Sequence, residues 1–198
     1  MSSQRTGHVV DASGLPPEYP THLHAGQFWE QLGRTVATFG FLEETLGKAI
    51  FALTATRKYD EGEIDAAYAK WLPKLNRAVS DPLGGLIDSY GKALREHPEV
   101  KYAGADTLID DLRSAAQLRN VLCHGSWRTP DGDGKSLPLF ITPKMMKFET
   151  PIDVAYLRQT RAHVVELVCS VVNSVTHMGW QFPGTSGPGE VVYQSRKK

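Results

Sequence analysis

The side chains of this 198-residue chain that could do chemistry together stand in one short stretch, residues 119–125. Arg119 contributes a guanidinium, Asn120 a carboxamide and His124 an imidazole. An imidazole titrates near neutrality and can take or give a proton, and a guanidinium can hold a phosphate and neutralise the charge that develops on it. This set is sufficient for metal-independent cleavage of RNA, in which the 2′-hydroxyl of the substrate is the nucleophile.

Other chemistries have less support. The two cysteines, Cys123 and Cys169, lack the spacing of zinc ligands, and we expect small buried thiols in a reducing compartment. Asp131 and Asp133 resemble a calcium loop, but its other acidic ligands are missing, so these residues favour a turn. We expect neither a metal nor a cofactor. The histidines lack ligand spacing, which argues against a metal-dependent hydrolase; they include His22, His97, His124, His163 and His177.

The first strong helical pattern covers residues 25–53. Its apolar side chains recur every three, four or seven residues and therefore share one side of a helix. Glu43 falls on that side, where a carboxylate is costly unless it is paired. We expect Glu43 to meet a cation or hydrogen-bond donors inside the fold; alternatively, the bundle is open there and Glu43 reaches solvent. The apolar residues are Phe28, Leu32, Val36, Phe39, Leu46, Ile50 and Leu53.

A second clear helix is predicted over residues 106–122. Arg119 falls on its apolar inner side, whereas His124 lies past the predicted helix end, where Gly125 stops the helix. A buried guanidinium needs several acceptors, and its fork suits a carboxylate. The two helices therefore predict an ion pair between Glu43 and Arg119.

Further helical patterns complete a mainly α fold. Weaker ones cover residues 62–78 and 86–94, and Pro82 with Gly84-Gly85 marks a turn or kink before the second. The last helix is predicted over residues 152–180. Its broad, Val-rich face suits a core helix and a dimer interface.

The period of the apolar residues changes between the last two of these helices. Residues 126–128 and 137–141 predict a short β-hairpin with a Gly-rich tip, and residues 145–150 predict a third strand. We therefore predict a bundle of four to five helices with a small β-meander, at residues 125–150, inserted before the last long helix.

Length and composition predict one soluble domain at residues 24–182, between flexible ends at residues 1–23 and 183–198. Lys plus Arg equals Asp plus Glu, so no net charge attracts nucleic acid or an anionic membrane. No apolar run approaches the length of a membrane span, and the N-terminus lacks the apolar stretch of a secretion signal. We expect a cytoplasmic protein.

Arg119-Asn120-x-x-x-His124, at the end of a helix in an all-α bundle, resembles the signature of the HEPN superfamily. That signature is an Arg followed a few residues later by a His, often with a polar residue directly after the Arg. The resemblance is specific over residues 119–125. Elsewhere it extends only to the order of the helices and to an acidic residue in the first helix.

The resemblance implies a small helical bundle that forms a homodimer and cleaves RNA. Many members are ribonucleases of toxin–antitoxin or other anti-phage systems, in which the Arg and His of two protomers form one site. Arg119 and His124 would then be the catalytic pair, with Asn120 orienting them and Glu43 holding Arg119. An antitoxin or a nucleotidyltransferase is the partner class that this setting implies.

Two alternatives to a ribonuclease remain open on the sequence. One is a non-catalytic helical module that binds a nucleotide or a partner protein through the same end of the fold. The other is a structural role, in which Arg119 and Asn120 tie the helix end to Glu43 and the β-meander, and His124 is a cap residue. Trp127 and Arg128 could stack on or clamp a nucleotide, or Trp127 could fill the core beneath the hairpin.

A second copy of the loose motif, Arg158 to His163, lies inside the last helix with no helix stop. It is typical of a solvated helix face.

Overall fold

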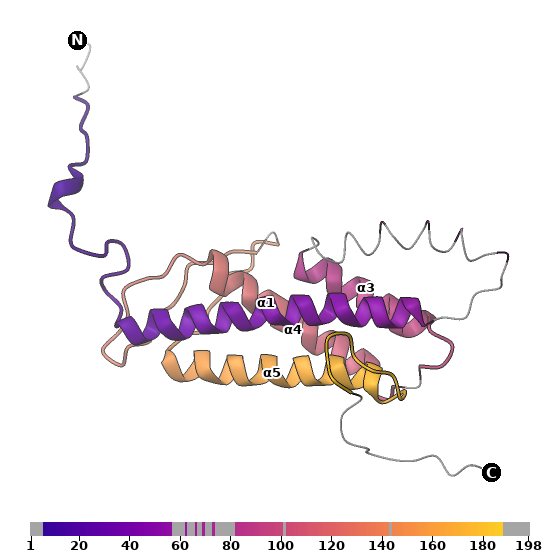
Figure 1. The fold of residues 1–198 in the computed structure, drawn as a ribbon. Helices are drawn as coiled ribbons and strands as arrows, with labels where there is room; N and C mark the ends of the chain where they lie inside the picture. The colour runs from indigo at the N-terminus through magenta and orange to yellow at the C-terminus, as the bar shows by residue number, and fades with distance from the viewer. Residues whose placement is uncertain are drawn as a thin grey trace.

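The structure is a computed structural model, and it describes residues 6–56, 62, 66, 69, 73, 82–100, 102–142 and 144–187. Within these residues the chain forms a bundle of four α-helices, so the predicted mainly helical fold is confirmed. The helix predicted at residues 62–78 lies almost entirely outside the described residues. The four helices are α1 (Gly26–Ala55), α3 (Leu83–Glu96), α4 (Ala105–His124) and α5 (Val154–Thr176), shown in Figure 1.

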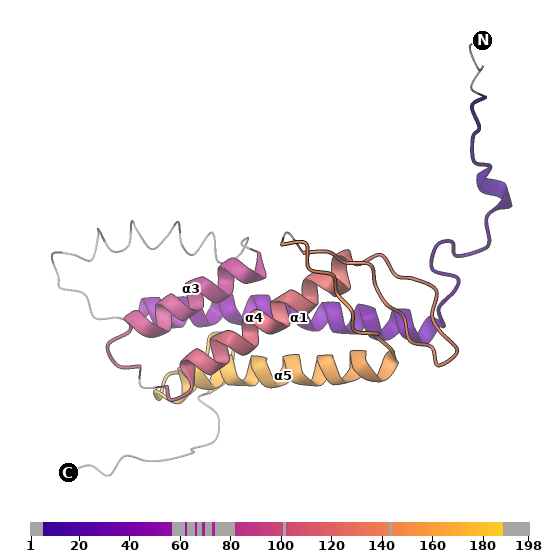
Figure 2. The same ribbon diagram turned by 180° about the vertical axis from the view of Figure 1, so that it is seen from behind.

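The two longest helices, α1 and α5, lie side by side and run in the same direction (Figure 1). Toward their N-terminal ends, the Thr35 hydroxyl donates to the Leu157 carbonyl across 3.2 Å. Toward the other end, the Lys48 side chain lies against Gly184, just after α5. Helix α4 runs in the opposite direction and crosses α1 obliquely (Figure 2). This crossing determines which residues of α4 reach the core.

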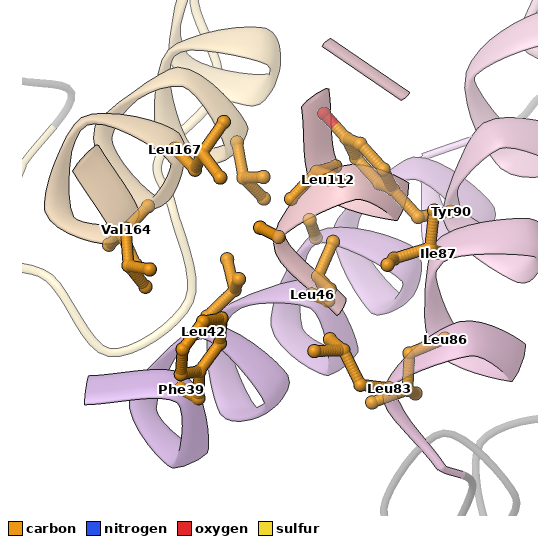
Figure 3. Packing of buried hydrophobic residues seen from close by; sticks show 14 of the residues in the cluster. Phe39, Leu42, Leu46, Leu83, Leu86, Ile87, Tyr90, Leu112, Val164 and Leu167 are labelled. Carbon is orange, nitrogen blue, oxygen red and sulfur yellow. The ribbon is translucent and has the colours of Figure 1, made fainter. Parts of the chain in front are cut away.

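The core lies where the four helices meet (Figure 3). Its apolar side chains come from α1 at the predicted spacing of three and four residues, and from the facing sides of the other helices. Burying each large apolar side chain stabilises the fold by about 1.5–3 kcal/mol. The central residues are Phe39, Leu42, Leu46, Leu83, Leu86, Ile87, Tyr90, Leu112, Val164 and Leu167.

The predicted β-hairpin and third strand are wrong. Residues 125–150, which we call the meander, contain no strand among those described; they form single antiparallel bridges such as Ser126 with Leu139. Prolines explain the difference, because Pro130 and Pro138 offer no N–H to a ladder of hydrogen bonds. The backbone of the meander therefore pairs only at single residues, although its side chains alternate as in a strand.

Helix α3 begins earlier than predicted. Pro82 is its N-cap, and Gly84 and Gly85 lie in its first turn rather than in a separate turn or kink. Leu83 and Leu86 are almost fully buried, so packing stabilises a first turn that glycine alone disfavours.

Helix α5 is shorter than predicted, because it ends at Thr176. Gly179 adopts the left-handed conformation, with φ of 83°, and reverses the chain. Trp180 then lies edge-on against His97, with ring centres 4.8 Å apart, and Phe182 is buried. The residues after α5 therefore close the end of the bundle.

Within the described part of the chain, no helix is both long enough and apolar enough to cross a membrane.

We predict that Tyr90→Phe lowers the free energy of unfolding by about 1–2 kcal/mol, measured by urea denaturation. The Tyr90 hydroxyl donates to Ser174 Oγ across 2.7 Å, and both residues are buried between α3 and α5. Tyr19→Phe is the control, because Tyr19 is exposed. Equal stabilities of Tyr90→Phe and the wild type would contradict the prediction.

Candidate functional site

Arg119 and Glu43 form the predicted ion pair. Arg119 Nη2 lies 3.5 Å from Glu43 Oε1, and the two side chains are 30% and 29% exposed. Both expectations for Glu43 are therefore partly met: the carboxylate is paired, and it also reaches solvent. At this exposure, the pair positions the guanidinium more than it stabilises the fold.

The helix phase explains this position. Arg119 lies one turn after Ala115 on the inner side of α4, and Ala115 is buried. One turn further on the same side is Cys123, which is exposed. Val121 and Leu122 stay buried, so the last turn of α4 still packs on the core, and Arg119 and Cys123 lie at the edge of its buried side.

His124 is the last residue of α4 and not a residue beyond it, so this part of the prediction is wrong. The Gly125 N–H donates to the Val121 carbonyl across 2.8 Å, which extends the helical hydrogen bonding to the last turn. The His124 side chain is exposed. On a helix, His124 points roughly 140° away from Arg119, so one chain does not place the imidazole beside the guanidinium.

Asn120 is exposed and shares a face of α4 with His124, four residues later. Its Oδ1 accepts from Arg119 Nη1 at 3.4 Å, the outer limit of a hydrogen bond. The contact of Asn120 with Arg119 is therefore weak in this structure. Asn120 lies between the directions of Arg119 and His124.

Gly125 is required at the end of α4 for space, not for a left-handed backbone. Its φ of −68° suits any residue. A Cβ there, however, would lie 2.6 Å from the Val121 carbonyl oxygen and 2.9 Å from Pro138 Cβ. The meander therefore packs directly against the last turn of α4.

Trp127 packs inward and joins an aromatic cluster with His24, Phe28 and Trp29. Its ring centre lies 5.0 Å from that of Phe28 and 6.4 Å from that of His24. This placement favours packing over nucleotide stacking for Trp127. Arg128 is exposed, and its carbonyl accepts from Ser136 Oγ across 2.6 Å.

The second copy of the motif lies on the surface of α5, as its sequence context predicts. Arg158 and His163 are exposed, and His163 Nδ1 lies 3.7 Å from Glu166 Oε2. His163 also lines a groove that Leu118 of α4 borders, and the helical patterns alone did not predict this groove. A line of polar residues at positions 156, 160 and 163 was the available signal, because these positions share one side of a helix.

Both cysteines are exposed, so the expectation of buried thiols is wrong. Cys123 lies at the edge of the buried side of α4, directly after the buried Leu122. Cys169 lies one turn after Val165, which is exposed on the outer side of α5. Among the described residues, no group of three or more His, Cys, Asp or Glu side chains is placed to hold a metal ion.

Comparison of the chain with models of protein families, with curated proteins and with solved structures found no match.

We predict that Gly125→Ala lowers the free energy of unfolding by about 1–3 kcal/mol, because the added methyl group forces Pro138 or the last turn of α4 to move. Urea denaturation followed by Trp fluorescence measures the change. Gly132→Ala, in the same segment, is the matched control, since its Cβ would meet no atom within 4 Å. A loss equal in both variants would contradict a specific contact at Gly125.

We predict that His24 makes the fold less stable in mild acid. Burial lowers the pKa of His24 below its ordinary value of 6.5, and neither ring nitrogen has a hydrogen-bond partner in the described part of the chain. The unfolded chain therefore binds the proton more readily, so stability is full above pH 6.5 and declines as the pH falls below it. Melting temperatures between pH 5 and 8 measure the decline, and His24→Phe should flatten it. An equally steep decline in His24→Phe would show that other groups cause it.

Proposed function

We propose that this protein is a metal-independent endoribonuclease of the HEPN type that acts as a homodimer. One observation carries the proposal: the ion pair with Glu43 holds the Arg119 guanidinium at the edge of the core, one turn before an exposed His124. A guanidinium fixed by one carboxylate still has donors to offer a phosphate. An exposed imidazole is free to exchange protons with a substrate.

The divergence of Arg119 and His124 within one chain supports a site shared between two chains. A two-fold axis beside the end of α4 would bring Arg119 of one protomer toward His124 of the other. The exposure of Asn120, Cys123 and His124 leaves this surface open to such a contact. Arginine and histidine side chains can both take part in catalysis without a metal ion or a cofactor.

The proposed reaction uses the hydroxyl of the substrate. His124 of one protomer takes the proton from the 2′-hydroxyl, and the 2′-oxygen attacks phosphorus. The bond from phosphorus to the 5′-oxygen breaks, a water molecule gives a proton to the leaving oxygen, and the imidazolium releases its proton to solvent. Arg119 neutralises the charge on the phosphoryl oxygens, and the products are a 2′,3′-cyclic phosphate and a 5′-hydroxyl. Asn120 orients the pair.

The proposed setting is the cytoplasm of a bacterium, in an anti-phage or toxin–antitoxin system. An antitoxin or a nucleotidyltransferase would then hold the site in check. This setting rests on the resemblance of the Arg-Asn-x-x-x-His arrangement to the HEPN signature.

A second candidate function is a non-catalytic module that binds a nucleotide or a protein partner at the same end of α4. The balance of 22 basic and 22 acidic residues favours it, because no net charge draws RNA toward the chain. A ligand of the folded state must raise the melting temperature, so thermal unfolding with added nucleotides tests this function.

We predict that wild-type protein cleaves single-stranded RNA in EDTA and that His124→Ala lowers the rate by about 10²–10⁴-fold. Arg119→Ala should be similarly impaired, and Glu43→Gln should show a smaller loss because it keeps the size of the side chain. Arg158→Ala, from the second copy of the motif, is the matched control and should keep full activity. If the wild type leaves RNA intact, or if the Arg119 and His124 variants match it, the ribonuclease assignment fails.

Mixing the two inactive variants tests the shared site. A dimer of one Arg119→Ala and one His124→Ala chain would contain one intact site if Arg and His come from different protomers. Activity should therefore return on mixing. Its absence, with mixed dimers verified by mass spectrometry, would contradict the shared site.

A further inference from the structure

A groove of about 250 Å³ lies between α1, α4 and α5. Phe39 forms its floor, Leu118 borders it from α4, and Val164 borders it from α5. Figure 3 shows Phe39 and Val164 at the margin of the core. The groove is open to solvent where α4 diverges from α5, so the same oblique crossing that exposes Arg119 also creates this space.

Thr160 lines the groove with a hydroxyl that has no partner in the described part of the chain. The residue is 8% exposed, and its hydroxyl makes no hydrogen bond within the described part of the chain. Hydroxyl groups in the core do have acceptors; Thr35 donates to Gln31, and Ser174 donates to Val171. The Thr160 hydroxyl, in contrast, is open to the space of the groove and can bond a ligand there. The groove is the space from which an acceptor or donor for Thr160 could come.

The same wall of α5 carries further polar groups. Tyr156, Thr160 and His163 follow one another at helical spacing along the groove, and Gln159 lies beside them. The Tyr156 phenol is half-buried, and Gln159 is exposed. The groove therefore has one wall that can donate and accept hydrogen bonds, opposite an apolar wall formed by α4.

We propose that this groove binds a single unpaired nucleobase of the RNA substrate. A base has two apolar faces and a polar edge, which match an apolar wall and floor on one side and the polar wall of α5 on the other. The volume is below the 300–1,000 Å³ or so of pockets for drug-sized ligands, so it suits one base and not a dinucleotide. This inference rests on the proposed ribonuclease function.

The position of the groove agrees with that use. Leu118 directly precedes Arg119, and Phe39 lies one helical turn before Glu43 on α1. A base seated in the groove would therefore place its own phosphates beside the Glu43–Arg119 pair. Thr160, Gln159 and His163 would be specificity residues that select the base, separate from the pair that acts on the phosphate.

The test is Thr160→Val, which removes the hydroxyl and keeps the shape of the side chain. Titration with each of the four ribonucleoside monophosphates, followed by NMR on the His163 imidazole, gives the dissociation constants. We expect at least one nucleotide to shift that signal, and Thr160→Val to weaken its binding about fivefold. The melting temperature should stay the same or rise, because the hydroxyl has no partner to lose.

Thr35→Val is the matched control. Its hydroxyl is hydrogen-bonded in the core, so the substitution should lower the melting temperature and leave nucleotide binding unchanged. This contrast separates loss of a ligand contact from loss of fold.

The outcomes distinguish the groove from the ribonuclease function. Nucleotide binding that depends on Thr160, in a protein that leaves RNA intact, would uphold the groove and refute the ribonuclease. RNA cleavage with the same base preference in wild type and Thr160→Val, and no shift at His163 with any nucleotide, would overturn the groove alone. Binding that Arg119→Ala abolishes and Thr160→Val leaves unchanged would also overturn it, because only the phosphate would then be recognised.

Discussion

The ion pair between Glu43 and Arg119 is the constraint on which the candidate site depends. Each residue lies on the side of its helix that faces the other helix, and the side chains stay 30% and 29% exposed, so the pair orients the guanidinium more than it stabilises the fold. Leu112, Val121 and Leu122 hold α4 against the core, and the pair holds the guanidinium beside them. Cys123 and His124 are exposed in the last turn of α4, and the groove lies between α4 and α5.

The meander limits where the last turn of α4 can go. Gly125 lets Pro138 approach closely, and Trp127 packs against Phe28 at the start of α1. Ser136 and Ile152 exchange backbone hydrogen bonds of 2.9 and 2.8 Å just before α5. These contacts connect the end of α4 to the starts of both long helices, although the segment has no regular strand. A rigid support of this kind keeps the guanidinium and imidazole at fixed positions on the surface.

Helix periodicity predicted the elements that bury a continuous apolar side, which are α1, α4 and α5, and it predicted the pairing of Glu43 with Arg119. The spacing of apolar residues identifies the inner side of a helix. It does not show how far along the helix a neighbouring helix covers that side. The burial of Cys123 was therefore predicted wrongly, since it lies at the edge of the side that Val121 and Leu122 bury. The end of α4 was placed at Leu122 rather than at His124 for a different reason, because periodicity does not fix the last residue of a helix. The groove was not predicted, since its walls belong to helices that are distant in the sequence.

The meander shows a different limit of the sequence. Its side chains alternate as they would in a hairpin, yet Pro130 and Pro138 remove the donors that a ladder needs. The alternation of side chains favours a strand there, but the missing N–H groups of the prolines prevent a regular ladder of hydrogen bonds. The glycine pair in α3 is the opposite case: Leu83 and Leu86 are buried, and this packing outweighs the poor helix propensity of Gly84 and Gly85.

The side-by-side packing of α1 and α5 has a consequence for how the protein is made. Of the four helices in the described part of the chain, α1 leaves the ribosome first, and α5, which covers it, leaves last. Until α5 emerges, Phe39 and Leu46 have only part of their final surroundings, and a growing chain exposes an apolar stripe. Contacts between such distant segments also slow folding, because a long loop must close before they form. The nascent chain therefore exposes this apolar stripe until α5 is complete, and it is prone to aggregation until then.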